Sequence, residues 1–71
     1  MNTTQKLTAI ATALGYTVSQ ESNNLVARDQ NGDTRLSATI VGGKFHGGYT
    51  TDRMGHVTSH STVRDMIRFA A

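Results

Sequence analysis

The sequence has no cysteine, no proline and no tryptophan among its 71 residues. Without cysteine it can form neither disulfides nor thiolate metal sites. No apolar run approaches the roughly 20 residues that span a bilayer, and the first residues lack the pattern of a secretory signal. We therefore expect one small domain, residues 1–71, that works in the cytoplasm without a membrane.

Charge is sparse and unevenly divided along the chain. Charged residues make up 17% of the sequence, and the formal net charge is +2. Residues 1–33 sum to −1, whereas residues 34–71 sum to +3 and hold all three histidines. A basic half can attract phosphate groups or an acidic protein. A dedicated DNA-binding protein usually has a denser cluster of Lys and Arg.

The two ends of the chain show the spacing of amphipathic helices. The first helix has four apolar residues on one face, namely Leu7, Ile10, Ala11 and Leu14. Thr3, Thr4 or a box of Asn2 with Gln5 can cap its start, and Gly15 can end it. The last helix repeats the spacing with Val63, Met66, Ile67 and Ala70, after a cap at Ser61 or Thr62.

Five short alternating segments between the helices predict strands. They are Tyr16–Glu21, Leu25–Asp29, Thr34–Val41, Lys44–Thr51 and His56–His60. Turns are expected at Asn31-Gly32, as a type I′ hairpin, at Gly42-Gly43, and at Asp52–Gly55. We predict an α+β fold, an antiparallel β-meander of four to five strands with the N-terminal and C-terminal helices packed on one face. No internal repeat is visible.

Alternation along the fourth segment assigns its side chains to the two faces of the sheet. Phe45 and Tyr49 share one face and are expected in the core, because they are its large apolar members. Lys44 and His46 then lie on the opposite, open face. A bulge at Gly55 would break this parity in the strand that follows.

The last hairpin should pair Thr50 with Thr58, Gly48 with His60 and Asp52 with His56. This register directs Val57 and Ser59 inward, and turns His56, Thr58 and His60 outward. The three histidines would then share one surface patch with Lys44. His46 and His60 would be diagonal neighbours, roughly 7–8 Å apart at Cα.

Such a patch suggests two kinds of chemistry. A metal site would use His46 and His60 with His56 or Asp52, but His56 and His60 are about 13 Å apart on a strand and cannot share one ion, so at most two histidines converge. For catalysis, His46, Asp52 and Ser59 supply suitable side chains, but no nucleophile elbow, Walker loop or HExxH motif is present. We expect no metal, no cofactor and no enzymatic activity.

Nucleic-acid binding is the alternative function that the basic C-terminal half supports. The side chains that can contact phosphates are Lys44, His46, Arg53 and Arg35. Phe45 and Tyr49 could stack on bases only if they faced outward, which the alternation argues against.

A protein-interaction module is the function that we favour. Ser- and Thr-rich sheet faces form hydrogen bonds readily, and Gly47-Gly48 inside a strand would leave backbone accessible to a partner. Small size without catalytic motifs is typical of the accessory proteins that phages and mobile elements encode, which inhibit or regulate a larger protein or nucleoprotein complex. The expected contact residues are Lys44, His46, Tyr49, Arg53, His56 and His60. Arg64 and Arg68 form a rival basic strip, and a homodimer would add buried area.

Overall fold

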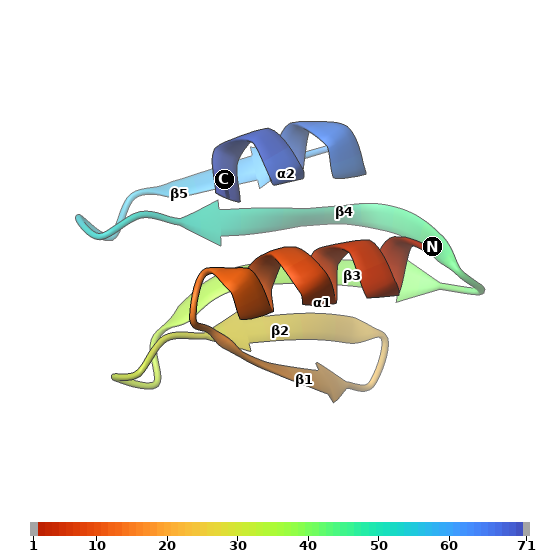
Figure 1. Ribbon diagram of the computed structural model, residues 1–71. Coiled ribbons are helices and arrows are strands. Elements are labelled where there is room, and N and C mark those ends of the chain that lie inside the picture. The colour runs from red at the N-terminus through yellow and green to blue at the C-terminus, as the bar shows by residue number, and fades with distance from the viewer. Residues whose placement is uncertain (1, 71) are drawn as a thin grey trace.

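The computed structural model describes residues 2–70 and contains two helices and one sheet. The elements are α1 (Thr3–Ala13), β1 (Thr17–Glu21), β2 (Asn24–Arg28), β3 (Thr34–Val41), β4 (Lys44–Thr51), β5 (Val57–His60) and α2 (Val63–Ala70). The strands pair antiparallel in the order β1-β2-β3-β4-β5. Both helices lie on the same face of the sheet (Figure 1). The predicted α+β meander is confirmed, with five strands.

The core lies between the helices and the inner face of the sheet. Leu7 and Ala11 of α1 and Met66 of α2 are at most 1% exposed. Beneath them lie the inward side chains of β2 and β3, which are Leu25, Ala27, Leu36, Ala38 and Ile40. Every second residue of β3 from Leu36 to Ile40 therefore points into the core, as the alternating pattern of a half-buried strand requires. Each fully buried Leu, Ile or Met contributes roughly 1.5–3 kcal/mol relative to exposure.

Both helix starts are fixed by side-chain caps. The Asn2 Oδ1 accepts from the Gln5 backbone N at 2.8 Å, and the Gln5 Oε1 accepts from the Asn2 backbone N at 3.1 Å. This reciprocal box leaves Thr3 inside α1. At α2 the Thr62 Oγ1 accepts from the Asp65 backbone N at 3.1 Å, so Thr62 acts as its cap.

The loop between β2 and β3 is built around one carboxylate. The Asp29 Oδ1 accepts from the backbone N of Asn31 at 2.9 Å and of Asp33 at 3.0 Å. Gly32 has a φ of 84°, and Asn31 is not at positive φ. The expected type I′ turn, which needs positive φ at both residues, is therefore wrong; the loop is wider because the Asp29 side chain organises it.

The loop between β4 and β5 repeats this arrangement. The Asp52 Oδ1 accepts from the backbone N of Met54 and of His56, both at 2.9 Å. Gly55 has a φ of 85°, as the sequence predicted. The two loops share the local pattern Asp-x-x-Gly, in which the carboxylate accepts from two backbone N–H groups of its own loop.

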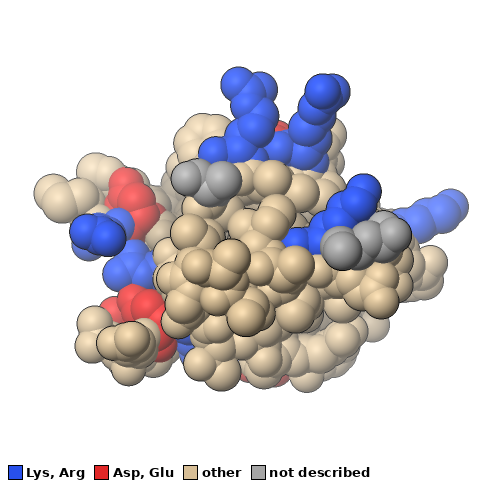
Figure 2. Space-filling view, in the orientation of Figure 1, with Lys and Arg blue, Asp and Glu red and all other residues tan. Residues whose placement is uncertain are grey.

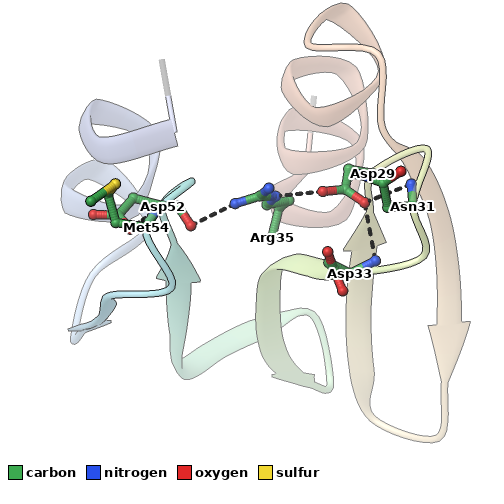
Figure 3. A network of polar contacts seen from close by, with 6 residues as sticks. All are labelled: Asp29, Asn31, Asp33, Arg35, Asp52 and Met54. Carbon is green, nitrogen blue, oxygen red and sulfur yellow. Dashed lines mark hydrogen bonds and ion pairs between the residues drawn. The ribbon is translucent and has the colours of Figure 1, made fainter.

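Arg35 joins these two loops at one end of the sheet (Figure 3). Its Nε lies 2.7 Å from the Asp29 Oδ2, and its Nη1 donates to the Asp52 carbonyl oxygen at 2.5 Å. The hydrogen bond from Arg35 lowers the pKa of Asp29, and the backbone N–H groups of the loop add to this effect. The pKa of Asp52 is also lowered, chiefly by the backbone N–H of His56.

A bulge at Gly47 interrupts β4. Ile40 pairs with Phe45, but Ala38 pairs with Gly48, so β4 has one residue more than β3 between these pairs. Gly47 takes up the extra residue with a φ of 111°. Because side chains alternate along a strand, one inserted residue reverses the faces of all residues that follow it. This reversal decides which side chains of β4 and β5 meet solvent.

Candidate functional site

The face of the sheet opposite the helices carries the candidate site, and we call it the open face. Its central row crosses all five strands through paired positions, in the order Ser19, Val26, Ser37, Tyr49 and Ser59. Tyr49 is 38% exposed and is the one aromatic side chain of this row. The row therefore presents a phenol ring among small hydroxyl groups.

A shallow depression lies beside Tyr49 on this face. The polar residues that line it are Asn24, Ser37, Thr39, His46, Tyr49, Ser59, His60 and Ser61. The Thr39 Oγ1 donates to the Asn24 Oδ1 at 2.8 Å, which fixes both side chains. The remaining hydroxyl groups can donate or accept, so the depression can form hydrogen bonds with either kind of group.

One border of the open face carries an ion pair. The Arg28 Nη1 lies 2.5 Å from the Glu21 Oε2, and the Ser19 Oγ donates to the same oxygen at 3.0 Å. The Arg28 hydrogen bond lowers the pKa of Glu21, and Ser19 lowers it further. Because the two charges offset each other, this border has little net attraction for anions.

The structure separates the six predicted contact residues instead of bringing them together. Lys44 and His46 are exposed on the open face, as predicted, because they precede the bulge. Arg53 and His56 are exposed in the β4–β5 loop, and β5 begins one residue after His56. The expected single patch of histidines is therefore wrong.

Tyr49 and His60 occupy the opposite sides from those expected. Tyr49 was expected in the core but lies on the open face, and His60 was expected outside but is only 3% exposed. The predicted pairs Gly48 with His60 and Thr50 with Thr58 are confirmed. The bulge at Gly47, which the alternation did not include, turned the paired segment over.

The same reversal corrects the rest of β5. Val57 is 63% exposed and Ser59 is exposed, although both were expected inward. Thr58, expected outward, is half-buried on the helix side. Phe45 precedes the bulge and packs against the core as predicted.

Gly48 is required by the packing of the core. A Cβ at this position would lie within 2.5 Å of the Met66 Cε and would clash with the Ser37 carbonyl oxygen. Only glycine therefore lets α2 approach β4 this closely. Gly47 and Gly48 also line the depression on the open face, so the expectation that their backbone is accessible to a partner stays a prediction.

His60 ties α2 to the sheet through both ring nitrogens. Its Nδ1 lies 2.6 Å from the Asp65 Oδ2, its Nε2 lies 2.8 Å from the Thr50 Oγ1, and its ring is 4.9 Å from that of Phe69. The order hydroxyl, imidazole, carboxylate is that of a hydrolase triad. An attacking hydroxyl must reach a substrate, however, and Thr50 is only 9% exposed. We call the contacts of His60 with Thr50, Asp65 and Phe69 the latch, because they hold α2 against the sheet.

The sequence contained a signal for this latch. His60 lies just before the Thr62 cap, and Asp65 lies in the first turn of α2. A side chain leaving the last strand residue can reach a carboxylate in the first helical turn. In a regular strand without the bulge, the alternation directs His60 to solvent, so the sequence alone did not predict its contact with Asp65.

The histidine pair considered for a metal does not form. His46 and His60 lie on opposite faces of the sheet, so they cannot share an ion. Within residues 2–70 no group of three His, Cys, Asp or Glu residues is placed to hold a metal ion.

Comparison with protein-family models, with curated proteins and with solved structures finds no match for this chain. Over the described residues, neither α1 nor α2 has the length and apolar character needed to cross a membrane.

Proposed function

We propose that the protein is a non-enzymatic binding module that docks through its open face on a larger protein or nucleoprotein complex and so inhibits or regulates it. The observation that carries this proposal is the uncovered sheet face with Tyr49 in its central row. Tyr, Ser, Gly and Asn line its depression. This composition is also favoured in antibody paratopes, because Tyr supplies rigid contact area and the small polar residues supply adaptable hydrogen bonds.

The exposed apolar side chains of the open face support a protein partner. Val41, Tyr49 and Val57 are 45%, 38% and 63% exposed. Protein interfaces depend on a few apolar or aromatic anchors surrounded by polar groups that exclude water. The strands hold these anchors in place, so little conformational entropy is lost when a partner binds.

Nucleic acid suits the open face less well. The outward Tyr49 removes one objection, since its ring could stack on a base. On this face, within residues 2–70, Arg28 is already paired with Glu21, so Lys44 is left as a single exposed cation beside His46. The single-stranded nucleic acid that such platforms bind needs a positively charged groove beside the aromatic rings.

Site-specific photo-crosslinking tests the proposal. A benzophenone amino acid replaces Tyr49 in one variant and Met54, which is 80% exposed in the β4–β5 loop, in the control. We expect a discrete adduct with a second protein only from position 49. Adding Ser37→Arg, which places a bulky charge beside that position, should abolish it.

Two outcomes would decide against this reading of the open face. Equal adducts from positions 49 and 54 would indicate non-specific contact, and no adduct at position 49 would refute docking there. An adduct of twice the mass of the chain would identify a second copy as the partner, the homodimer that the sequence analysis considered, and would contradict a separate larger target.

A further inference from the structure

Most basic side chains have no acidic side chain as a partner within residues 2–70. Of the seven Lys and Arg residues, Arg28 and Arg35 form ion pairs with Glu21 and Asp29. The others pair with no side-chain carboxylate of residues 2–70, and they are Lys6, Lys44, Arg53, Arg64 and Arg68. The modest net charge therefore understates the positive charge available on the surface.

Three of these cations belong to the helices. Lys6 lies on α1, and Arg64 and Arg68 lie four residues apart on α2, so the two arginines share one helix face. All three are exposed. Alpha-helix α1 contains no acidic residue, and the one acid of α2, Asp65, is engaged by His60.

The charges of the molecule are therefore segregated. Figure 2, which looks at the helix side, shows blue side chains standing out over α2, with most of the red at the end of the molecule where the β2–β3 and β4–β5 loops lie. Those loops carry Asp29, Asp33 and Asp52. The helix side thus presents positive charge with little opposing charge nearby.

We infer that the helix side binds the phosphate backbone of a nucleic acid through Lys6, Arg64 and Arg68. Lys and Arg contacts to phosphate give affinity without sequence preference. The exposed Gln5 and Thr12 of α1 add side chains of the kinds that donate to phosphate oxygens. With the open face docked on a protein, one chain could then contact both components of a nucleoprotein complex.

An acidic protein surface fits the helix side less well. Protein interfaces require apolar anchors, and Val41, Tyr49 and Val57 all lie on the open face. On the helix side Leu14 and Phe69 are 41% and 60% exposed, and one side of the Phe69 ring packs on His60. Exposed cations and polar side chains surround them, as on a phosphate-binding surface, which is more polar and more positively charged than a protein–protein interface.

The salt dependence of DNA binding provides the test. The fluorescence anisotropy of a labelled DNA duplex is measured with the protein at about 50 and 200 mM salt. Three phosphate contacts predict an affinity loss of about 40-fold between these concentrations. The variant Arg64→Gln/Arg68→Gln keeps one contact and should lose only about 3- to 4-fold, from a weaker starting affinity.

A matched control separates location from charge. The variant Lys44→Gln/Arg53→Gln removes the same two charges from positions outside the helices, and it should keep the loss of about 40-fold. Tyr49→Ala should leave DNA binding unchanged. Circular dichroism checks that each variant is folded.

Three results would overturn the inference. The unmodified protein could fail to bind the duplex at about 50 mM salt. The two double variants could weaken binding equally, which would mean that only total charge matters. A polyglutamate peptide could compete more strongly than unlabelled DNA at equal charge concentration, which would identify an acidic protein as the preferred ligand.

Discussion

The helix side and the open face of the sheet use the same strands for opposite purposes. On β3, Leu36 points to the helices and is 2% exposed, whereas its neighbour Ser37 points to the open face and is half-buried. The helix side is filled so tightly that Gly48 admits no Cβ. The open face carries small hydroxyl groups, the exposed rings of His46 and Tyr49, and the exposed side chains of Val41 and Val57. Stability therefore depends mainly on one face, and the other is available for contacts.

The bulge at Gly47 controls this division in β4. Before it, Phe45 packs inward; after it, Gly48 and Thr50 do. Without the extra residue, Tyr49 would enter the core and the glycine under Met66 would be lost. Substitutions on the two faces should therefore differ sharply in their effects.

Gly48→Ala should have one of the two largest effects, together with Leu36→Ala. Its methyl group would meet the Ser37 carbonyl and the Met66 side chain. Backbone cannot yield as a flexible side chain can, so we expect a loss of about 3 kcal/mol or more, at the upper end for overpacking. Urea unfolding followed by circular dichroism measures it, and a loss below about 1 kcal/mol would contradict this packing.

Leu36→Ala compared with Ser37→Ala tests the two faces on adjacent residues. Removing the Leu36 side chain should cost about 2–5 kcal/mol, because it leaves a cavity in the core. Ser37→Ala should change stability by no more than about 0.5 kcal/mol. Equal effects in the same urea experiment would mean that the faces are not divided as described.

Thr50→Val tests the latch and should cost about 1–3 kcal/mol. The change keeps the side-chain shape but leaves the buried His60 Nε2 without its partner. Hydrogen exchange should accelerate first in α2, which the latch holds. The neighbouring Thr51→Val serves as control, and an equal loss there would show that the hydrogen bond is not the cause.

Glu21→Gln should have the smallest effect and concerns the open face alone. Because Arg28 lowers the pKa of Glu21, the folded protein keeps this carboxylate ionised at lower pH than the unfolded chain does. The pair thus stabilises the fold above the unfolded pKa, and this contribution disappears as pH falls through the folded pKa.

The comparison of unfolding at neutral and acid pH isolates that contribution. Wild type should lose slightly more stability on acidification than Glu21→Gln does, and high salt should reduce the difference, since both side chains are well exposed. Identical acid profiles at low salt would show that the pair contributes nothing.

Local patterns in the sequence predicted the fold well. The limits of β3 and β4 and the inward side chains of β3 agree with the structure, because turns and two-residue alternation are local properties. The Asn2 and Gln5 box was one of the stated alternatives.

The site was harder to predict because it depends on one inserted residue. A glycine inside a strand is compatible with a regular pleat or with a bulge, and we considered a bulge only at Gly55. The bulge at Gly47 exchanged Tyr49 and His60 between the two faces.

Arg35 affects the geometry of the sheet beyond the residues that it contacts. Its guanidinium connects two hairpin loops that would otherwise be linked only through the strands between them. Since an arginine keeps its charge at every physiological pH, these contacts persist at pH values at which a histidine would lose its charge. Its two contacts therefore restrain the β2–β3 and β4–β5 loops relative to each other, in addition to the pairing of β3 with β4.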